Sequence, residues 1–284
     1  MTIPRVTIGV PVRNGASELA SCLNCLTNQT FRDIEILILD NASTDRTPDI
    51  ILEAMRTDPR IRYIRNKEDI GAAANFTATL KEARAPYFMW RAYDDLSDSN
   101  YVESLVAALD ANPNAGLAAP NVETIRTLSN RRRLRMAPEA TIAMLSRPAA
   151  QRRMIRQLQA GWIYGLFRRE FLVEVKTYID REFQFVWAVD FIMLVAAALR
   201  REIVGVPTTT LRLQLTGARK EYSQSELRAE RTALVRNYWR VLEQLLSEKA
   251  LSPVQRLMFR ITFVWHIQRR VAKWPILIRA LISK

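Results

Sequence analysis

VTIGVPV at residues 6–12 and IEILIL at residues 34–39 decide the fold, and SELASCLNCL at residues 17–26 lies between them. The two outer stretches are almost continuous runs of aliphatic and β-branched residues, which is typical of strands buried on both faces. The middle stretch carries apolar residues at helical spacing, at Leu19, Cys22, Leu23 and Leu26. Together they predict a strand, a helix and a second strand, the unit from which parallel sheets are built.

The same alternation continues to residue 120. Strand patterns occur at residues 61–64, 87–90 and 116–119, and helical patterns at residues 47–55, 71–83 and 101–109. This order predicts an α/β fold with a mostly parallel sheet and helices on both of its faces. In such folds ligands bind at the carboxyl ends of the strands.

Beyond residue 120 the pattern changes. Residues 121–160 are rich in arginine and show no strand alternation, so we expect a loop and a helix that cover the edge of the sheet. We expect a strand at residues 161–167, a short helix at 169–175, a buried helix at 189–199 and a strand at 203–206. Residues 223–284 read as a helical appendage broken at Pro253 and Pro275, which leaves residues 1–222 as the main domain.

Composition narrows the class of protein. The chain has 284 residues, of which 42 are Lys or Arg and 29 are Asp or Glu, so its formal net charge is +13. Cys22, Cys25 and His266 are too few for a disulfide framework or a Cys/His zinc site, and we interpret both cysteines as small core residues. We expect His266 at a surface or an interface. Neither a secretory signal nor a membrane-spanning helix is recognisable, so a cytoplasmic protein is expected.

Carboxylates stand where strands of the predicted sheet end. Asp40 follows the second strand, and Asp94 and Asp95 follow the fourth, so we expect them to line one pocket. Adjacent carboxylates repel each other and gain most from a shared cation such as Mg²⁺ or Mn²⁺. Asp45 and Asp98 precede helices, and we interpret them as helix caps.

Several of these stretches resemble one family. VTIGVPVRNG at residues 6–15, QTF at 29–31 and ILILDNASTD at 36–45 are similar to the opening of family 2 glycosyltransferases with the GT-A fold. The resemblance continues at residues 71–75 and 87–95, more weakly at 164–169 and 190–207, and spans residues 4–215. It implies a Rossmann-like GT-A domain at residues 1–222, with a nucleotide-binding half at 1–120 and an acceptor-binding half at 121–222.

The resemblance also implies a donor, a nucleotide-diphospho-sugar, and the residues that bind it. Asp40 would accept a hydrogen bond from a uracil-type N–H, which favours UDP-sugars and leaves guanosine and thymidine open. The implied nucleotide-binding residues are Pro11, Val12, Arg13, Asn14, Asp40, Asn75, Tyr93 and Asp94.

In this family an Asp-x-Asp motif holds a metal ion on the diphosphate, and it aligns here with Ala92-Tyr93-Asp94, so the first acid is missing. The resemblance leaves Asp94 as ligand for Mn²⁺ or Mg²⁺, supported by Asp95. A histidine that the family often carries later has no counterpart at residues 211–216. We expect Arg219 or Lys220 to supply positive charge to the diphosphate instead.

Asp190 matches the catalytic carboxylate of similar enzymes. In an inverting transfer it would take the proton from the acceptor hydroxyl that attacks the anomeric carbon. The alternative interpretation of Asp190 is a helix N-cap.

These residues indicate a metal-dependent inverting glycosyltransferase that builds a cell-surface or exopolysaccharide glycan on a glycan or lipid-linked acceptor. The alternative is a non-catalytic protein that binds sugar nucleotides or glycans, because Ala92 replaces an acid and the later histidine is absent. No nucleic-acid partner is expected, since the arginines form no recognisable binding module. The first strand–helix turn, residues 11–16, lacks the G-x-G-x-x-G of dinucleotide-dependent oxidoreductases.

The C-terminal residues 254–284 mix aromatic and aliphatic side chains with Lys and Arg. This composition is typical of an interfacial membrane anchor, here on the inner membrane face. It equally fits an amphipathic helix that packs on the main domain or on a second subunit of a homo-oligomer.

Overall fold

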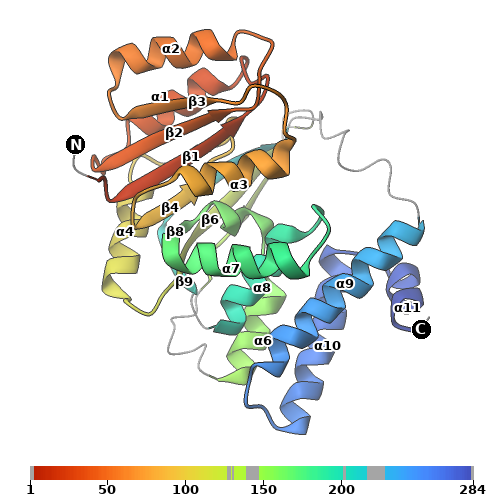
Figure 1. The fold of residues 1–284 in the computed structure, drawn as a ribbon. Coiled ribbons are helices and arrows are strands. Elements are labelled where there is room, and N and C mark those ends of the chain that lie inside the picture. The colour runs from red at the N-terminus through yellow and green to blue at the C-terminus, as the bar shows by residue number, and fades with distance from the viewer. Residues whose placement is uncertain are drawn as a thin grey trace. The chain divides into compact units, whose positions relative to one another are not determined.

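The computed structural model describes residues 3–126, 129, 131–138, 147–200, 203–215 and 228–282 (Figure 1). The chain divides into two compact units. Unit 1 comprises Met1–Pro138, Gly161–Val173 and Val204–Thr216, and unit 2 comprises Glu139–Ala160, Glu174–Ile203 and Gly217–Lys284.

Unit 1 begins with the predicted alternation of strands and helices. The parallel strands are β1 (Val6–Val12), β2 (Ile34–Asp40), β3 (Ile61–Arg65) and β4 (Tyr87–Trp90). Between and after them lie α1 (Leu19–Thr27), α2 (Thr47–Thr57), α3 (Ala72–Glu82) and α4 (Tyr101–Ala111). β1 pairs in parallel with both β2 and β4. The α/β fold predicted from the sequence is therefore confirmed.

The sheet is mixed rather than mostly parallel, which corrects the prediction from the sequence, because the strands of its second half pair antiparallel. This half contains β5 (Leu96–Ser97), β6 (Leu117–Arg126), β7 (Arg131–Arg135), β8 (Leu166–Arg168) and β9 (Ile203–Leu215). The strand order is β3-β2-β1-β4-β8-β6-β9-β5, with β7 beside β6. β4 pairs antiparallel with β8, β8 with β6, β6 with β7, and β5 with β9.

Two expectations for this half were wrong. Residues 121–126 and 131–135 form a hairpin rather than a loop, because β7 is an edge strand whose exposed arginines give no apolar alternation. Residues 160–164 form a 3₁₀ helix, and the strand expected from residue 161 begins only at Leu166. The indole N–H of Trp162 there donates to the carbonyl of Pro120 at 3.2 Å, which ties the 3₁₀ helix to β6.

The core of unit 1 lies between the sheet and its helices. At Gly9 in β1, an added Cβ would lie 2.4 Å from Cγ2 of Thr79 and 2.9 Å from the ring of Phe88. α3 therefore packs directly on the backbone of β1, as the nearby ribbons in Figure 1 show. This close contact holds the middle of β1 against the second half of α3.

Unit 2 is helical. α6 (Pro148–Gln157), α8 (Val189–Arg200), α9 (Arg228–Ser247), α10 (Pro253–Arg270) and α11 (Trp274–Ile282) belong to it. α7 (Arg169–Glu182) begins in unit 1 and ends in unit 2. The predicted breaks are confirmed, since α10 begins at Pro253 behind a capping box from Ser252 and Gln255, and Pro275 lies in the first turn of α11.

The sequence led us to expect His266 at a surface or an interface, and this was wrong, because its side chain is fully buried within unit 2. It lies on the buried face of α10 with Phe259 and Phe263, at helical spacing. Its Nε2 is 3.0 Å from the hydroxyl of Tyr238, and its ring meets Phe191 edge-on. His266 is buried because it packs against Tyr238, 28 residues earlier in the chain, and the sequence around His266 does not reveal this partner.

Within the described part of the chain, no helix is both long enough and apolar enough to cross a membrane.

Candidate active site

The carboxyl ends of β1, β2 and β4 lie side by side at one edge of the unit 1 sheet. Val12 is paired with Asp40 across β1 and β2, and Gly9 with Trp90 across β1 and β4. The loops that leave these three strands therefore begin next to one another. This is where open α/β sheets bind ligands.

The loops after β1 and β2 are fastened to each other. Asn14 has a positive φ of 50°, a conformation that Asn tolerates better than most residues. Its backbone N–H donates to Oγ of Ser43 at 2.9 Å, and its side-chain oxygen accepts the N–H of Thr44 at 2.8 Å. The N–H of Gly15 donates to Oγ1 of Thr47 at 2.9 Å. Two of the predicted residues, Arg13 and Asn14, thus lie in a loop of fixed shape, and two more, Pro11 and Val12, are the last residues of β1 before it.

Asp40 is fully buried at the end of β2. Its carboxylate accepts the backbone N–H of Ser43 and the hydroxyl of Tyr63, each at 2.9 Å, and its Oδ2 lies 3.4 Å from Nε of Arg65. Burial and the hydrogen bond to Asp40 raise the pKa of Tyr63 to about 12. Asp40 therefore holds the β2–α2 loop to β3, and its predicted contact with a base stays a prediction.

Asn75 is also buried, in the first turn of α3. Its side-chain NH₂ donates to the carbonyl of Leu39 at 2.9 Å, and its oxygen accepts from Asn66 at 3.1 Å. Asn66 donates in addition to Oδ1 of Asn41 at 3.0 Å. These amides join the ends of β2 and β3 to α3. Asn41 and Asn66 were not predicted from the sequence, although their positions directly after β2 and β3 would have indicated both.

Arg13 makes an ion pair with Asp69, and both side chains are partly exposed. Asp69 also accepts the side-chain N–H of Asn41 and the backbone N–H of Gly71. The hydrogen bond to Gly71 and the charge of Arg13 lower the pKa of Asp69. Asp69 thereby holds the partly exposed guanidinium of Arg13 beside the carboxyl ends of the strands, where it could bind an anionic ligand.

Tyr93, with Asp94 next to it in the chain, lies against the loop after β1. A Cβ added to Gly15 would lie 2.7 Å from the ring of Tyr93, so this ring covers the loop backbone. Burial raises the pKa of Tyr93, with further contributions from the charges of Asp94, Glu18 and Asp45. Tyr93, predicted from the sequence to bind the nucleotide, is therefore adjacent to the loop that carries Arg13 and Asn14, and Asp94 follows it in the chain.

Asp95 is buried, and one of its oxygens accepts the backbone N–H of Gln214 at 2.9 Å. It thus ties the acidic pair to the end of β9. Arg91, four residues earlier, is fully buried; it donates to Oγ of Ser97 at 3.1 Å and lies 4.8 Å from the ring centroid of Tyr101. Arg91 and Gln214 were not predicted from the sequence, because no local pattern marks either residue.

The carboxylates at this edge suit a metal ion that is shared with a bound substrate rather than one held by protein ligands alone. Among the described residues, no three His, Cys, Asp or Glu side chains are grouped closely enough to hold a metal. Asp94 is half-buried, and Asp95 accepts the backbone N–H of Gln214, so two neighbouring carboxylates lie at this edge. Mg²⁺ is commonly held in this way, with substrate phosphates and water as the remaining ligands. The residues present therefore fit a divalent ion that arrives with a diphosphate.

Asp190 belongs to unit 2 and is the second residue of α8. It is half-buried and comes two residues after Ala188, whose φ is 65°. Burial, together with the charge of Asp190, raises the pKa of Tyr238 well above its usual value. Asp190 lies in the first turn of the helix rather than at its N-cap, and its catalytic role stays a prediction. Arg219 and Lys220 lie outside the described residues.

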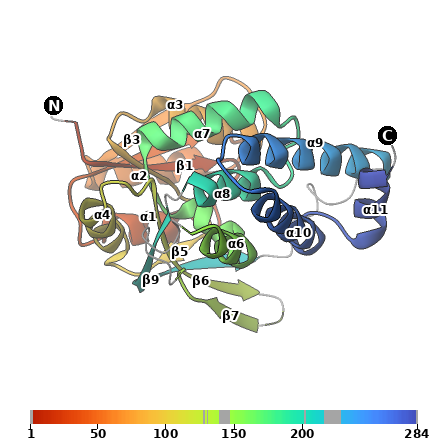
Figure 2. The same ribbon diagram turned by 90° about the horizontal axis from the view of Figure 1, so that it is seen from below.

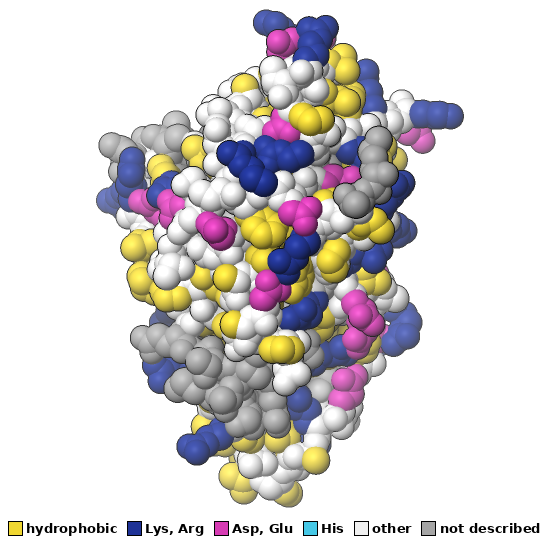
Figure 3. Space-filling model, turned by 90° about the vertical axis from the view of Figure 1, so that its left-hand side faces the viewer, with side chains coloured by type: hydrophobic (Ala, Val, Ile, Leu, Met, Phe, Trp, Pro, Cys, Tyr) yellow, Lys and Arg dark blue, Asp and Glu magenta, His cyan; other side chains and the backbone are white. Residues whose placement is uncertain are grey.

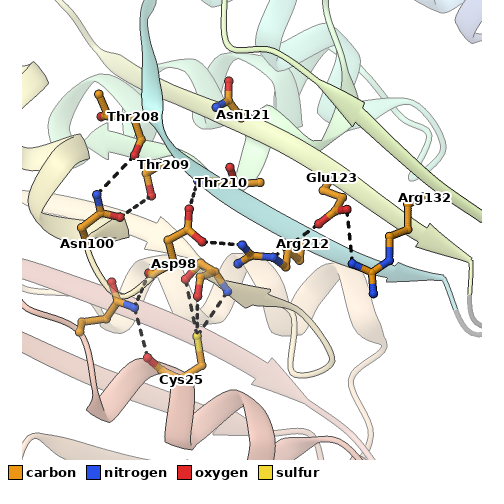
Figure 4. A network of polar contacts seen from close by, with 12 residues as sticks. Cys25, Asp98, Asn100, Asn121, Glu123, Arg132, Thr208, Thr209, Thr210 and Arg212 are labelled. Atoms are coloured by element: carbon orange, nitrogen blue, oxygen red, sulfur yellow. Dashed lines mark hydrogen bonds and ion pairs between the residues drawn. The ribbon is translucent and has the colours of Figure 1, made fainter.

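Figure 4 shows what Asp98 does instead of capping a helix. Its carboxylate accepts the backbone N–H of Thr210 at 2.9 Å and pairs with Arg212 at 2.6 Å, both on β9. The capping role expected for Asp98 was therefore wrong, because β9 supplies better donors. Asp45 does accept the N–H of Thr47 at the start of α2, at 3.0 Å.

Cys22 is buried, and burial raises the pKa of its thiol to about 12. Cys25 donates to the carbonyl of Ser97 at 3.4 Å. A thiol with so high a pKa is a packing group rather than a nucleophile.

Comparison with known proteins defines the family. Residues 7–175, more than half of the chain, match Glycosyl transferase family 2. The chain belongs to this family. It is 34% identical over 101 residues to glycosyltransferase GlyA of Streptococcus pneumoniae, and 32% identical over 106 residues to the putative glycosyltransferase EpsH of Bacillus subtilis. These stretches cover 36% and 37% of this chain but only 14% and 30% of the two relatives.

Solved structures share the fold. The S. aureus TarS fragment 1–349 in complex with UDP-GlcNAc matches with a TM-score of 0.73 at 17% identity, over 98% of this chain and 79% of that one. The mannosyltransferase PcManGT from Pyrobaculum calidifontis, in complex with GDP-Man and Mn²⁺, matches with a TM-score of 0.57 at 17% identity. That alignment covers 100% of this chain and 75% of the other. The GT-A fold is thereby established.

Proposed function

We propose that this protein transfers a sugar from a nucleotide-diphospho-sugar, with UDP-sugars favoured, to an acceptor hydroxyl with inversion at the anomeric carbon. The observation that carries the proposal is the convergence of Arg13, Asn14, Tyr93 and Asp94 at the carboxyl ends of β1 and β4. The Mn²⁺ or Mg²⁺ ion and the product, a cell-surface or exopolysaccharide glycan, belong to the same proposal.

Each side chain has a separate task in this scheme. Asn14 and the loop locked by Asp40 and Asn75 shape the pocket for the base and ribose, and Arg13 offers its guanidinium to an anionic group. Asp94, supported by Asp95, would hold the metal ion, which when bound offsets charge on the departing diphosphate. Asp190 would accept the proton of the attacking hydroxyl, a contribution typically worth ~10²–10⁴-fold in rate.

Two features support the donor class. A TarS structure contains UDP-GlcNAc, and the PcManGT structure contains GDP-Man and Mn²⁺. Among the described residues, Asp94 and Asp95 have no third His, Cys, Asp or Glu beside them that could complete a metal site. A metal ion held by this acidic pair would therefore have coordination positions left for phosphate oxygens. Both nucleotide classes therefore belong in the test.

Peripheral association with the inner membrane face is part of the proposal. α10 exposes apolar side chains at helical spacing, and α11 does the same. The exposed residues are Val254, Leu257, Met258 and Ile261 on α10, and Trp274, Ile278 and Leu281 on α11. Lys273 and Arg269 are exposed near the junction of the two helices. Apolar stripes beside cationic side chains are the features by which helices lie on anionic lipid.

The experiment is a thermal-unfolding panel of UDP, GDP and dTDP and their sugars, each with and without Mn²⁺ or Mg²⁺. A ligand at 100 times its dissociation constant stabilises a protein by about 2.7 kcal/mol, which gives a clear shift. Asp94→Asn should remove the metal-dependent part of the shift. The matched control is Asp33→Asn, an exposed carboxylate at the opposite, amino-terminal end of β2.

A metal-dependent shift for one nucleotide class that Asp94→Asn loses and Asp33→Asn keeps supports the proposal. The absence of any shift in the wild type contradicts it. In that case the missing acid at Ala92 has removed donor binding, and a non-catalytic glycan-binding role takes its place.

A further inference from the structure

The two sides of the β6–β7 hairpin in unit 1 differ in their charged residues. β6 and β7 pair antiparallel, with Val122 opposite Arg135, Thr124 opposite Arg133 and Arg126 opposite Arg131. Directly opposed residues project from the same side of a sheet, and successive residues project from opposite sides. Figure 2 shows the hairpin, with β7 as its outer strand.

This register puts four arginines on one side of the hairpin, Arg126, Arg131, Arg133 and Arg135, which we call the arginine face. The other side carries Arg132, whose guanidinium is 3.9 Å from Glu123. Glu123 also pairs with Arg212 of β9 at 3.5 Å, as Figure 4 shows. Glu123, the only carboxylate in β6 and β7, therefore lies on the side opposite the arginine face and pairs with arginines there.

The charges on the arginine face are not compensated within the described part of the chain. No ion pair there joins any of the four guanidiniums to a carboxylate. Burial and the neighbouring charge of Arg133 lower the pKa of Arg135. On the face drawn in Figure 3, Lys and Arg side chains lie among Asp and Glu side chains. Like charges held side by side repel each other, and an anionic ligand would relieve that repulsion.

The hairpin is connected to the acidic pair through β9. Arg212 of β9 contacts Glu123 of β6, and Gln214 of β9 donates its N–H to Asp95. Two residues along a strand span about 6.7 Å. Within unit 1, the hairpin is therefore joined by one short strand segment to the residues proposed to bind the donor diphosphate.

We propose that the arginine face binds a linear polyanion, namely an acceptor glycan that carries phosphate or carboxylate groups at regular intervals. Arg131, Arg133 and Arg135 form a row with a repeat of about 6.7 Å, which suits repeated charges better than one isolated phosphate. Guanidinium groups bind both phosphate and carboxylate through paired hydrogen bonds. This identification of the acceptor class rests on the proposed function.

A lipid surface fits this face less well. Membrane-binding surfaces place exposed apolar side chains among their basic ones. The exposed Leu134 belongs to the opposite side of β7, and Val122 on the arginine face is buried. The face is thus basic without apolar groups that could enter a bilayer.

The test measures binding of the full chain to inorganic polyphosphate, to polygalacturonate and to neutral dextran, at 50, 100 and 200 mM salt. Arg131→Gln/Arg133→Gln/Arg135→Gln should weaken binding to both polyanions by about tenfold or more at 100 mM salt, and lower the salt slope by roughly 3. The charge-matched control is Arg56→Gln/Lys81→Gln/Arg84→Gln, which removes three exposed cations on or next to α2 and α3. It should change affinity by no more than about twofold.

Equal weakening by the two triple variants would overturn the proposal, since net charge alone would explain it. Absence of polyanion binding by the wild type would also overturn it, as would loss of binding to phosphatidylglycerol vesicles without loss of polyphosphate binding. If the triple variant does not fold, Arg133→Gln should still weaken binding several-fold, whereas Arg132→Gln on the opposite side should not.

The nucleotide panel keeps this result apart from the proposed function. The triple variant should retain the thermal shift of the wild type with nucleotide and metal, because none of its positions lies at the ends of β1, β2 or β4. A chain that binds polyanions through this face but no nucleotide would contradict the proposed function. A chain that binds nucleotide but no polyanion would contradict the acceptor class alone.

Discussion

His266 makes the stability of unit 2 depend on pH in a way that can be calculated. Its ring is buried, and burial lowers its pKa from 6.5 to about 4, with a smaller contribution from the positive charge of Arg270. Neutral Nε2 lies 3.0 Å from the hydroxyl of Tyr238. In the unfolded chain the same histidine titrates near its ordinary pKa of about 6.5.

The sign follows from proton binding. Between pH 6.5 and pH 4 the unfolded chain binds a proton at His266 that the folded chain does not, so the free energy of unfolding falls as the pH falls. The contribution is fully present above pH 6.5. A pKa difference of this size removes about 2 kcal/mol by pH 5 and about 3 kcal/mol by pH 4.

The assay compares urea unfolding of the wild type and His266→Gln at pH 7.5, 6 and 5. Glutamine retains hydrogen-bonding capacity toward Tyr238 and does not titrate. The variant should lose about 2 kcal/mol less than the wild type between pH 7.5 and 5. His266 is the chain's one histidine, so its imidazole signal in a proton NMR titration gives the pKa directly.

Equal pH dependence in the two proteins, or an NMR pKa near 6.5, would refute this reasoning. Either result would mean that the ring is hydrated or that the Tyr238 contact does not persist in solution.

Three further perturbations test other parts of the structure. Asp190→Asn should leave the thermal shift with nucleotide unchanged and remove sugar transfer; unchanged transfer would exclude Asp190 as the base. Gly9→Ala places a Cβ 2.4 Å from Cγ2 of Thr79 and should lower the free energy of unfolding by about 1–3 kcal/mol in urea titrations, whereas a neutral effect would mean that α3 does not pack on β1 as described. Leu257→Ser/Ile261→Ser should reduce sedimentation with phosphatidylglycerol vesicles, while the control Leu52→Ser/Met55→Ser on exposed positions of α2 should not; equal losses would dismiss α10 as the contact surface.

Much of unit 1 was predictable because local and global signals agree there. β1 and β2 are almost continuous apolar runs, and α1 between them has a regular apolar face. The carboxylates at the strand ends were found by the rule that ligands bind at those ends. The same rule, applied to β3, would also have indicated Asn66 and Asp69.

Other features depend on distant partners and could not be predicted. β7 lacks an apolar face, so its alternation is hidden in a run of arginines. Asp98 resembles a helix cap until Arg212 of β9, 114 residues later, is placed beside it. His266 looks like a surface residue until Tyr238 and Phe191 enclose it. In each case tertiary contacts override a local preference.

Hydrogen–deuterium exchange with and without UDP-GlcNAc and Mn²⁺ tests the central claim most directly. If the carboxyl ends of β1, β2 and β4 bind the donor, the donor should slow exchange in the loops at residues 13–16, 41–46 and 91–95, and leave α9 unchanged. GDP-Man replaces UDP-GlcNAc if the thermal panel selects guanosine. Protection confined to other segments, by a nucleotide that binds, would contradict the assignment of this edge as the donor site.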